Sequence, residues 1–418
     1  PLKISDWPVT IIGGSNVVTS GAIIAVPDRT ILVSPGMNIQ GAINSLGAQG
    51  GVIKLLVGTH TINNSLTIND DNIQLTGEGP GTILSASPTW LGGISTDDAV
   101  IQVGASDGTS PRSNIVINNF QLQVGPNIHG IQVNGGTEVK VMDMTVSSIA
   151  PKTTGRVGIL FTDGAASPSS RLTLTRSLIT RDVATNRWVD GVHMDGDASF
   201  PGLYGYGNGI TDSILSEVIV NEAAETSFAF SAVSASAVFS NRARDMGFNA
   251  GAIAMFFQNS NDVLIINNTI EGNNNATATG LRFNSNVDDS IVLGNTIRGG
   301  PQNFSIALYI ANANCERNVL DDNIIVGANT RLTDAGTSTK IESNHVRSNN
   351  DPTVNDDNDD GYPIGTMWIN LTTGNVFMLV DSTVGAAVWN ALTGGGHAQN
   401  TDTGTTSNSF VLDTDNTG

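Results

Sequence analysis

The sequence is poor in cysteine, in basic residues and in long apolar runs, and each shortage excludes a class of protein. Its single cysteine, Cys315, excludes an internal disulfide framework and a cysteine-based zinc site. Lys and Arg number 19 against 38 Asp and Glu, and a net charge of −19 repels phosphate backbones, so we expect no nucleic-acid partner. No run of 18 apolar residues occurs, so we expect no membrane insertion. The chain begins at Pro1 with neither a Met nor a signal-peptide pattern, which indicates a processed or excised fragment.

Aromatic and charged residues are also scarce, at 5% and 14% of the chain. The hydrophobic share of 39% is nonetheless too high for a disordered chain. The Ala/Glu/Lys/Leu heptads of a long coiled coil are absent as well. What the chain does contain is 47 glycines, many asparagines and short apolar segments, so a repeat is the first pattern to seek.

Short β-rich segments recur between about residues 71 and 349, and several of the later ones end in asparagine. These asparagines are Asn268, Asn295, Asn323 and Asn344, at intervals of 27, 28 and 21 residues. A variable period in the twenties, with three short strands per turn, predicts a right-handed parallel β-helix in which each coil covers the next. We expect the asparagines to be structural, at left-handed corners or in ladders of hydrogen bonds between coils.

A second class of strand alternates with the first, in quartets such as Gly130-Ile-Gln-Val and Gly191-Val-His-Met. Alternation of side chains sends the second and fourth residues of each quartet into a narrow core and the third to the outside. The predicted outward residues are Gln132, Leu160, His193, Ala229, Phe256, Arg282 and Tyr309. We expect them to form an exposed stripe that holds a long polymer or packs against a neighbouring subunit.

The two ends of the chain differ from the solenoid in pattern. Apolar residues at positions 39, 42, 43 and 46 have the spacing of one helical face, which predicts a short helix that caps the first coil. We therefore divide the chain into five parts. They are an N-terminal segment or connector (1–36), the β-helix (37–350), an acidic linker (351–360), a small β module (361–392) and a flexible tail or truncated next module (393–418). The predicted class is all-β.

The acidic linker is the one segment whose composition suits a metal ion. Its carboxylates alternate with asparagine, as in calcium loops, but glycine and glutamate are missing from the EF-hand positions. We predict no metal site and no cofactor.

The solenoid, with its helix-and-strand entry over Ile39–Val57, resembles the pectate-lyase-like right-handed β-helix superfamily. The stretch Asp360–Asn375, with Gly385-Ala-Ala-Val-Trp, resembles modules of bacteriophage tail fibres and tailspikes, and the tail from Ala398 is similar to repeats of such fibres. The resemblance covers most of residues 37–418. It implies a homotrimeric protein of the virion tail, extracellular, joined to other tail proteins and directed at a bacterial surface polysaccharide (capsule, exopolysaccharide or lipopolysaccharide).

One coil, from Thr180 to Ser213, is longer than its neighbours by more than a dozen residues and concentrates chemically active side chains. Long loops in an economical solenoid usually have a function, and rings beside carboxylates suit a sugar site. The candidate catalytic residues are Asp190, His193, Asp195 and Asp197. The candidate substrate-binding residues are Arg181, Arg187, Trp188, Phe200, Tyr204, Tyr206, Glu222 and Glu225.

These residues can serve chemistry or local structure. A glycoside hydrolase needs two carboxyls, whereas a lyase needs a base and a cation that neutralises a uronate. Asp195-Gly196 is first of all a turn, because Asn134-Gly135 and Asp163-Gly164 fall at similar places in earlier coils, and His193 suits an exposed surface or interface. The paired aspartates, Gly-His-Gly and Arg-Ile-Lys of polygalacturonases are absent, which argues against that kind of hydrolase.

Three functions remain open. The first is a tail fibre or tailspike that binds polysaccharide for host recognition. The second is a polysaccharide depolymerase, either a glycoside hydrolase or a lyase, and the third is a structural fibre shaft without a ligand. A homotrimer is expected because an exposed stripe with Leu160, Phe256 and Tyr309, and a C-terminal module with Trp368 and Trp389, both need cover.

Overall fold

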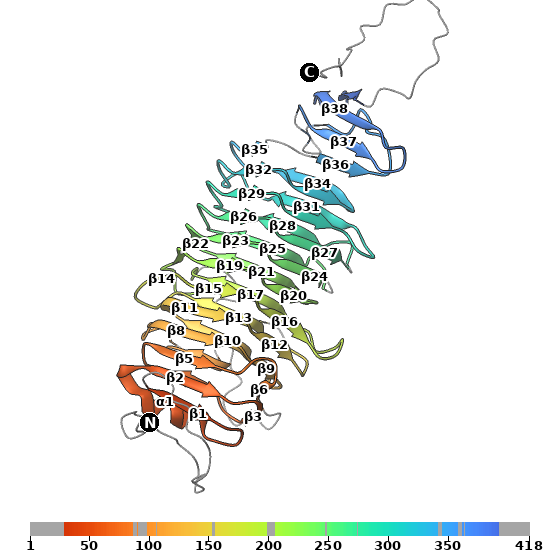
Figure 1. The fold of residues 1–418 in the computed structure, drawn as a ribbon. Coiled ribbons are helices and arrows are strands. Elements are labelled where there is room, and N and C mark those ends of the chain that lie inside the picture. Colours follow the sequence, from red (N-terminus) through yellow and green to blue (C-terminus); the bar gives the residue numbers. More distant parts are fainter. Residues whose placement is uncertain are drawn as a thin grey trace, which may run out of the picture.

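The structure, a computed structural model, is an elongated solenoid with the N-terminal coils at one end and a small antiparallel module at the other (Figure 1). It describes residues 29–86, 90, 98–105, 107–152, 155–198, 205–246, 249–273, 275–341, 345–357, 362 and 364–392. The N-terminal segment before residue 29, the tail from residue 393, and Phe200, Tyr204 and Asn344 lie outside the described residues.

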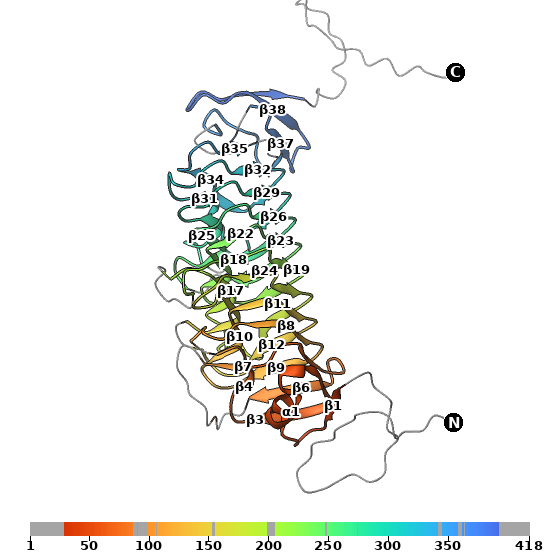
Figure 2. The same ribbon diagram turned by 90° about the vertical axis from the view of Figure 1, so that its left-hand side faces the viewer.

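Three sheets run along the solenoid, and each turn of the chain contributes a strand to each sheet in the order A, B, C (Figures 1 and 2). Strand pairing within the coils is parallel throughout the described part, so the fold is the predicted right-handed parallel β-helix. Sheet A consists of β1 (Thr30–Val33), β2 (Gly51–Leu55), β5 (Ile73–Thr76), β8 (Arg112–Asn118), β11 (Gly136–Met142), β15 (Thr173–Thr175), β19 (Ile214–Ser216), β23 (Ala237–Phe239), β26 (Leu264–Ile266), β29 (Ile291–Leu293), β32 (Val319–Asp321) and β35 (Lys340–Ile341), with β14 (Ser169–Ser170), β18 (Ile210–Thr211) and β22 (Val233–Ser234) beside it.

The other two sheets complete each coil. Sheet B consists of β3 (Gly58–Ile62), β6 (Thr82–Ala86), β9 (Gln121–Val124), β12 (Thr145–Ser148), β16 (Leu178–Arg181), β20 (Ile219–Asn221), β24 (Arg242–Met246), β27 (Thr269–Asn273), β30 (Thr296–Arg298), β33 (Ile324–Val326) and β36 (His345–Ser348), and continues into the C-terminal module. Sheet C consists of β4 (Leu66–Ile68), β7 (Ala99–Val103), β10 (His129–Asn134), β13 (Val157–Thr162), β17 (Asp190–Asp195), β21 (Thr226–Ser231), β25 (Ile253–Gln258), β28 (Thr279–Phe283), β31 (Phe304–Ile310) and β34 (Ala328–Asp334).

Asparagine ladders tie the upper coils together inside the solenoid. The Asn295 side chain accepts hydrogen bonds from the backbone and side-chain nitrogens of Asn268, and donates to the Asn323 side chain at 3.0 Å. Asn241 continues the ladder downward by donating to Asn268. The left-handed residue of the corner is the one before each rung, such as Asn267 with φ 53°, so the rungs themselves serve as hydrogen-bond bridges.

A short helix closes the bottom of the solenoid, as the spacing of apolar residues predicts. Helix α1 (Ile39–Leu46), which runs into a 3₁₀ turn (Gly47–Gln49), buries Ile39, Ala42, Ile43 and Leu46. The Asn38 side chain accepts the Gly41 amide at 2.9 Å and so caps its first turn. The buried face covers the open end of the first coil (Figure 2).

The C-terminal module adds three strands to sheet B: β37 (Met367–Asn370), β38 (Val376–Asp381) and β39 (Val388–Ala391). The first pairs parallel with β36 and the other two pair antiparallel, so the module grows directly out of the last coil. Its small core is held by Tyr362, Trp368 and Trp389, whose rings meet edge to face at 5.4–5.9 Å.

Candidate functional site

Sheet C brings the predicted outward stripe into register. Gln132, Leu160 and His193 are paired in successive strands, and the same row continues through the other members to Tyr309. The expectation that the whole stripe is exposed is wrong, because Leu160 is fully buried, His193 is 5% exposed and Phe256 is 7% exposed. Arg282 and Tyr309, in the upper coils, are half-buried and reach solvent.

Carboxylates gather where β17 ends and the chain turns towards sheet A. The Asp195 carboxylate accepts the backbone amide of Asp197 at 3.1 Å and lies 4.0 Å from Nε2 of His193. The Asp197 carboxylate accepts hydrogen bonds from the side chains of Asn259 and Gln258, the latter at 3.5 Å. Three of the four candidate catalytic residues, together with two amides from a coil above, therefore form one cluster.

A fourth residue, Asp163, belongs to this cluster and was not singled out from the sequence. Its carboxylate accepts the backbone amides of Tyr206, Asn208 and Gly209, and so fixes the end of the long insertion to the coil below. Burial raises the pKa of the Asp163 carboxyl, these hydrogen bonds lower it, and nearby Asp195 raises it further. The available signal was the Asp163-Gly164 pair, which lies one register position beyond Asp195-Gly196 because Thr162 pairs with Asp195.

Asp190 lies at the other end of β17 and has a different environment. Its carboxylate accepts the amide of Thr226 at 3.0 Å. Burial raises the pKa of the Asp190 carboxyl to about 6, with His193 acting in the opposite direction and Glu225 adding to the rise. Asp195 follows Asp190 by five positions along the strand, which holds their backbones about 16 Å apart. These two carboxyls do not form a pair.

The predicted binding residues at the corner between sheets B and C make several contacts within the protein. Arg181 makes an ion pair with Glu222, and burial together with Arg181 lowers the pKa of Arg187. Trp188 is 2% exposed, donates from its indole nitrogen to the Thr180 carbonyl at 2.9 Å, and packs in the hydrophobic core. The prediction of Trp188 as an accessible ring is wrong, since the corner turns it inward.

Lys152 packs over the Trp188 ring, 5.2 Å from its centroid. Its ammonium group donates to the carbonyls of Val124 and Pro126. Burial lowers the pKa of Lys152 to about 7, with nearby Arg156 adding to the effect. Lys152 therefore covers one side of the Trp188 ring.

Among the aromatic residues predicted in the insertion, Tyr206 is half-buried and lies against Gly108, where an added Cβ would meet the ring at 2.4 Å. Three corner segments thus pack together at this edge, since the Ala165 amide also donates to the Gly108 carbonyl. Phe200 and Tyr204 lie outside the described residues.

The accessible part of the stripe is a cation-and-ring pair in the upper coils. The Arg282 guanidinium lies 5.2 Å from the ring centroid of Tyr309 and donates to the Asn284 side chain at 2.7 Å. Asn284 in turn donates to Gln258, which also lies beside Asp197. A continuous polar network therefore connects the accessible upper stripe with the carboxylate cluster.

No metal-binding group of three or more His, Cys, Asp or Glu residues occurs in the part of the chain that the structure describes. Within the same residues, no helix is long and apolar enough to cross a membrane.

The sequence matches no protein-family model, and it matches no curated protein. Its fold is similar to those of solved structures. One is a hyperthermoactive exopolygalacturonase from Thermotoga maritima, with a TM-score of 0.51 and 12% identity over 76% of this chain and 92% of that chain. A second is the ORF18 protein of Geobacillus virus E2, with a TM-score of 0.45 and 15% identity over 84% of this chain and 59% of that chain. A third is the enzymatically active domain of tailspike protein 2 from bacteriophage CBA120, with a TM-score of 0.43 and 12% identity over 74% of this chain and 44% of that chain.

This chain spans only about half the length of the two viral proteins it matches. At this identity the similarity to the exopolygalacturonase shows the fold alone, a right-handed parallel β-helix.

Proposed function

We propose that the protein is a bacteriophage tail fibre or tailspike that binds bacterial surface polysaccharide along the outer face of sheet C. The observation that carries the proposal is the accessible Arg282–Tyr309 pair on a flat, in-register sheet. From Ala229 to Thr333 the stripe crosses four coil spacings, about 19 Å, which suits an extended oligosaccharide.

The side chains on this face have the chemistry that a sugar site requires. An aromatic ring such as Tyr309 covers the apolar face of a sugar, and amides such as Asn284 bond to hydroxyls. The guanidinium of Arg282 offsets the chain's negative charge where an acidic polysaccharide would bind. The resemblance of Asp360–Asn375 to modules of tail fibres and tailspikes supports a location on the virion tail, with other tail proteins as partners.

A polysaccharide depolymerase is the second candidate, and the cluster of Asp195, Asp197 and His193 favours it. Two carboxyls in different environments can serve as acid and base in glycoside hydrolysis. Asp195 and Asp197 are the candidates for these roles, while Asp163 holds the insertion in place. Binding comes first in our proposal because Asp195 is fully buried, whereas Arg282 and Tyr309 reach solvent.

The proposal is tested with purified capsules, exopolysaccharides and lipopolysaccharides, using calorimetry for binding and mass spectrometry for released fragments. We expect Tyr309→Ala and Arg282→Ala each to weaken binding by about 1–3 kcal/mol. Arg298→Ala, an exposed change on sheet B, serves as the control. If the protein is a depolymerase, the double variant Asp195→Asn, Asp197→Asn should lose turnover by orders of magnitude and still bind the glycan. If the wild type binds none of the glycans, the remaining function is that of a structural fibre shaft.

We also propose a homotrimer, on a surface different from the one the sequence indicated. The outer face of sheet A carries Ile214 and Leu264, each 41% exposed, and Phe239, 36% exposed. These residues belong to two rows of side chains that are paired in register from strand to strand. The other apolar members of the rows are half-buried: Ala237, Ile266, Ile291, Leu293 and Val319. Apolar side chains in register over successive coils need cover, and identical faces around one axis supply it.

A further inference from the structure

Arg331 lies at a position that the coils below keep small. The register of β31 with β34 pairs Ile306 with Thr330 and Leu308 with Leu332, so Arg331 stacks on Ala307. Further down, the same row holds Gly280, Ala254, Ser227, Gly191, Gly158 and Gly130. An added Cβ at Gly280 would meet the side chain of Ile297 in sheet B at 2.9 Å, so this row points into the interior. A long cationic side chain therefore enters the solenoid from its last coil.

Among the described residues, the guanidinium of Arg331 has no hydrogen-bond acceptor. Its three nitrogens are all buried, and none makes a hydrogen bond or an ion pair within that part of the chain. The guanidinium packs against the ring of Tyr362, whose centroid lies 4.8 Å away. A buried charge without acceptors is costly, so a ligand that brings an acceptor to it would be favoured.

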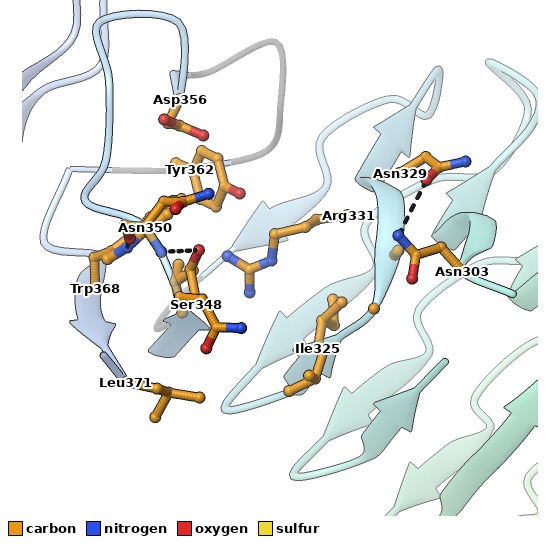
Figure 3. Close-up of a pocket in the computed structure, with 15 residues that line it drawn as sticks. Asn303, Ile325, Asn329, Arg331, Ser348, Asn350, Asp356, Tyr362, Trp368 and Leu371 are labelled. Atoms are coloured by element: carbon orange, nitrogen blue, oxygen red, sulfur yellow. Dashed lines mark hydrogen bonds between the residues drawn. The ribbon is translucent and has the colours of Figure 1, made fainter. Parts of the chain in front are cut away.

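Arg331 is one of the residues that line a cavity of about 540 Å³ between the last coil and the C-terminal module. Figure 3 shows it pointing away from its own strand towards Tyr362, Asn350 and Ser348. Ile325 and Val346 supply apolar lining, and the volume is in the range of small-molecule sites. The carboxylate of Asp356 also lines the cavity and accepts a hydrogen bond from the Thr353 hydroxyl at 2.8 Å.

We propose that this cavity binds the carboxylate of an acidic sugar, such as a hexuronate, through Arg331. The planar fork of a guanidinium matches a carboxylate with two parallel hydrogen bonds, which supplies the acceptors that the described residues do not. Tyr362 backs the guanidinium, and the amides and hydroxyl at the rim (Asn329, Asn350 and Ser348) suit sugar hydroxyls. The site shares no residue with the sheet C stripe, so it stands or fails separately from the proposed function.

The test is calorimetry of the full chain with sodium glucuronate, with glucose, acetate and inorganic phosphate as comparison probes. We expect saturable binding of glucuronate, at least about tenfold weaker binding of acetate and phosphate, and none of glucose. Arg331→Met should weaken glucuronate binding at least about tenfold, and Arg331→Lys by less, because it keeps the charge and loses the fork. No binding by the wild type, or equal binding of acetate or phosphate, would overturn the proposal.

One further variant shows whether glucuronate binding depends on Arg331 itself or on positive charge elsewhere on the chain. Arg298→Met removes the same charge from an exposed position on sheet B and should leave glucuronate binding unchanged. A loss of binding in Arg298→Met as large as that of Arg331→Met would contradict a site at Arg331.

Thermal melting distinguishes a ligand site from an internal cation–ring contact. Without ligand, Arg331→Met should melt at or above the wild-type temperature, because an unpaired buried charge is gone. Glucuronate should raise the melting temperature of the wild type and not that of the variant. A lower melting temperature for Arg331→Met, together with no rise of the wild-type melting temperature on addition of glucuronate, would show that Arg331 is structural and would contradict the proposal.

Discussion

Asn295 shows how much of the solenoid depends on single amide side chains. It accepts two hydrogen bonds from Asn268 and donates to Asn323 and to the carbonyl of Ile265. The change Asn295→Ala leaves several buried groups without partners, so we expect it to lower the free energy of unfolding by about 2–4 kcal/mol. Urea denaturation measures this loss. Asn314→Ala, at an exposed loop position, should change little, and an equal loss there would contradict the ladder's role.

Asp190 makes stability depend on pH in a defined direction. Its folded pKa of about 6 lies above the unfolded value of about 3.9, so its protonated form favours folding. The free energy of unfolding should therefore fall as the pH rises from about 4 to about 7. Asp190→Asn keeps an acceptor for the Thr226 amide and should remove about 2–3 kcal/mol of this fall.

Denaturation of both proteins at pH 4, 5, 6 and 7 measures the effect. The exposed Glu138→Gln provides a charge-matched control, and parallel pH profiles for the wild type and Asp190→Asn would contradict the prediction.

The sequence predicted individual residues well where a repeat constrained them and poorly where a loop did. The stacking of Asn268, Asn295 and Asn323 followed from their intervals, because a recurring interior position has the same partners in every coil. The burial of Leu160 and Trp188 did not follow, because alternation assigns a side chain to a face and says nothing about what covers that face.

At the scale of elements, helix α1 was predictable because the spacing of its apolar residues is a local signal that needs no knowledge of the other coils. The carboxylate cluster was only half predictable. Asp195 and Asp197 lie in one segment, but Asn259 comes from a coil about sixty residues later and was placed beside them by strand register. Contacts between residues of different coils cannot be predicted from the sequence until the number of residues in each coil is known.

The end of the long insertion should depend on Asp163. Asp163→Ala removes the acceptor of three backbone amides, so we expect faster hydrogen exchange at Tyr206, Asn208 and Gly209, with faster proteolysis between residues 196 and 209. Hydrogen-exchange mass spectrometry measures the exchange rates of residues 205–209 and of the coil that contains Asp163. Asp107→Ala, in the adjoining corner segment, should leave residues 205–209 protected, and unchanged exchange in Asp163→Ala would refute the anchor.

At the scale of the whole molecule, the exposed apolar rows of sheet A determine the expected assembly. Light scattering of the wild type should give three times the 43.4 kDa chain mass. Leu264→Lys places a charge in the middle of the rows and should shift the protein to monomers. Val57→Lys, at a position 58% exposed near the first coil, should remain trimeric, and a monomeric wild type at micromolar concentration would end the trimer proposal.

The asparagine ladder has a consequence for the length of the protein. Its rungs from Asn241 to Asn323 are 27, 27 and 28 residues apart, and each meets the next through the same bonds. Removing the 27 residues from Asn268 to Gly294 would bring Asn295 onto the position of Asn268 and restore every strand register above it. A coil is thus an interchangeable unit, so the distance between the helix-capped base and the aromatic module can change one rung at a time without redesign of either end.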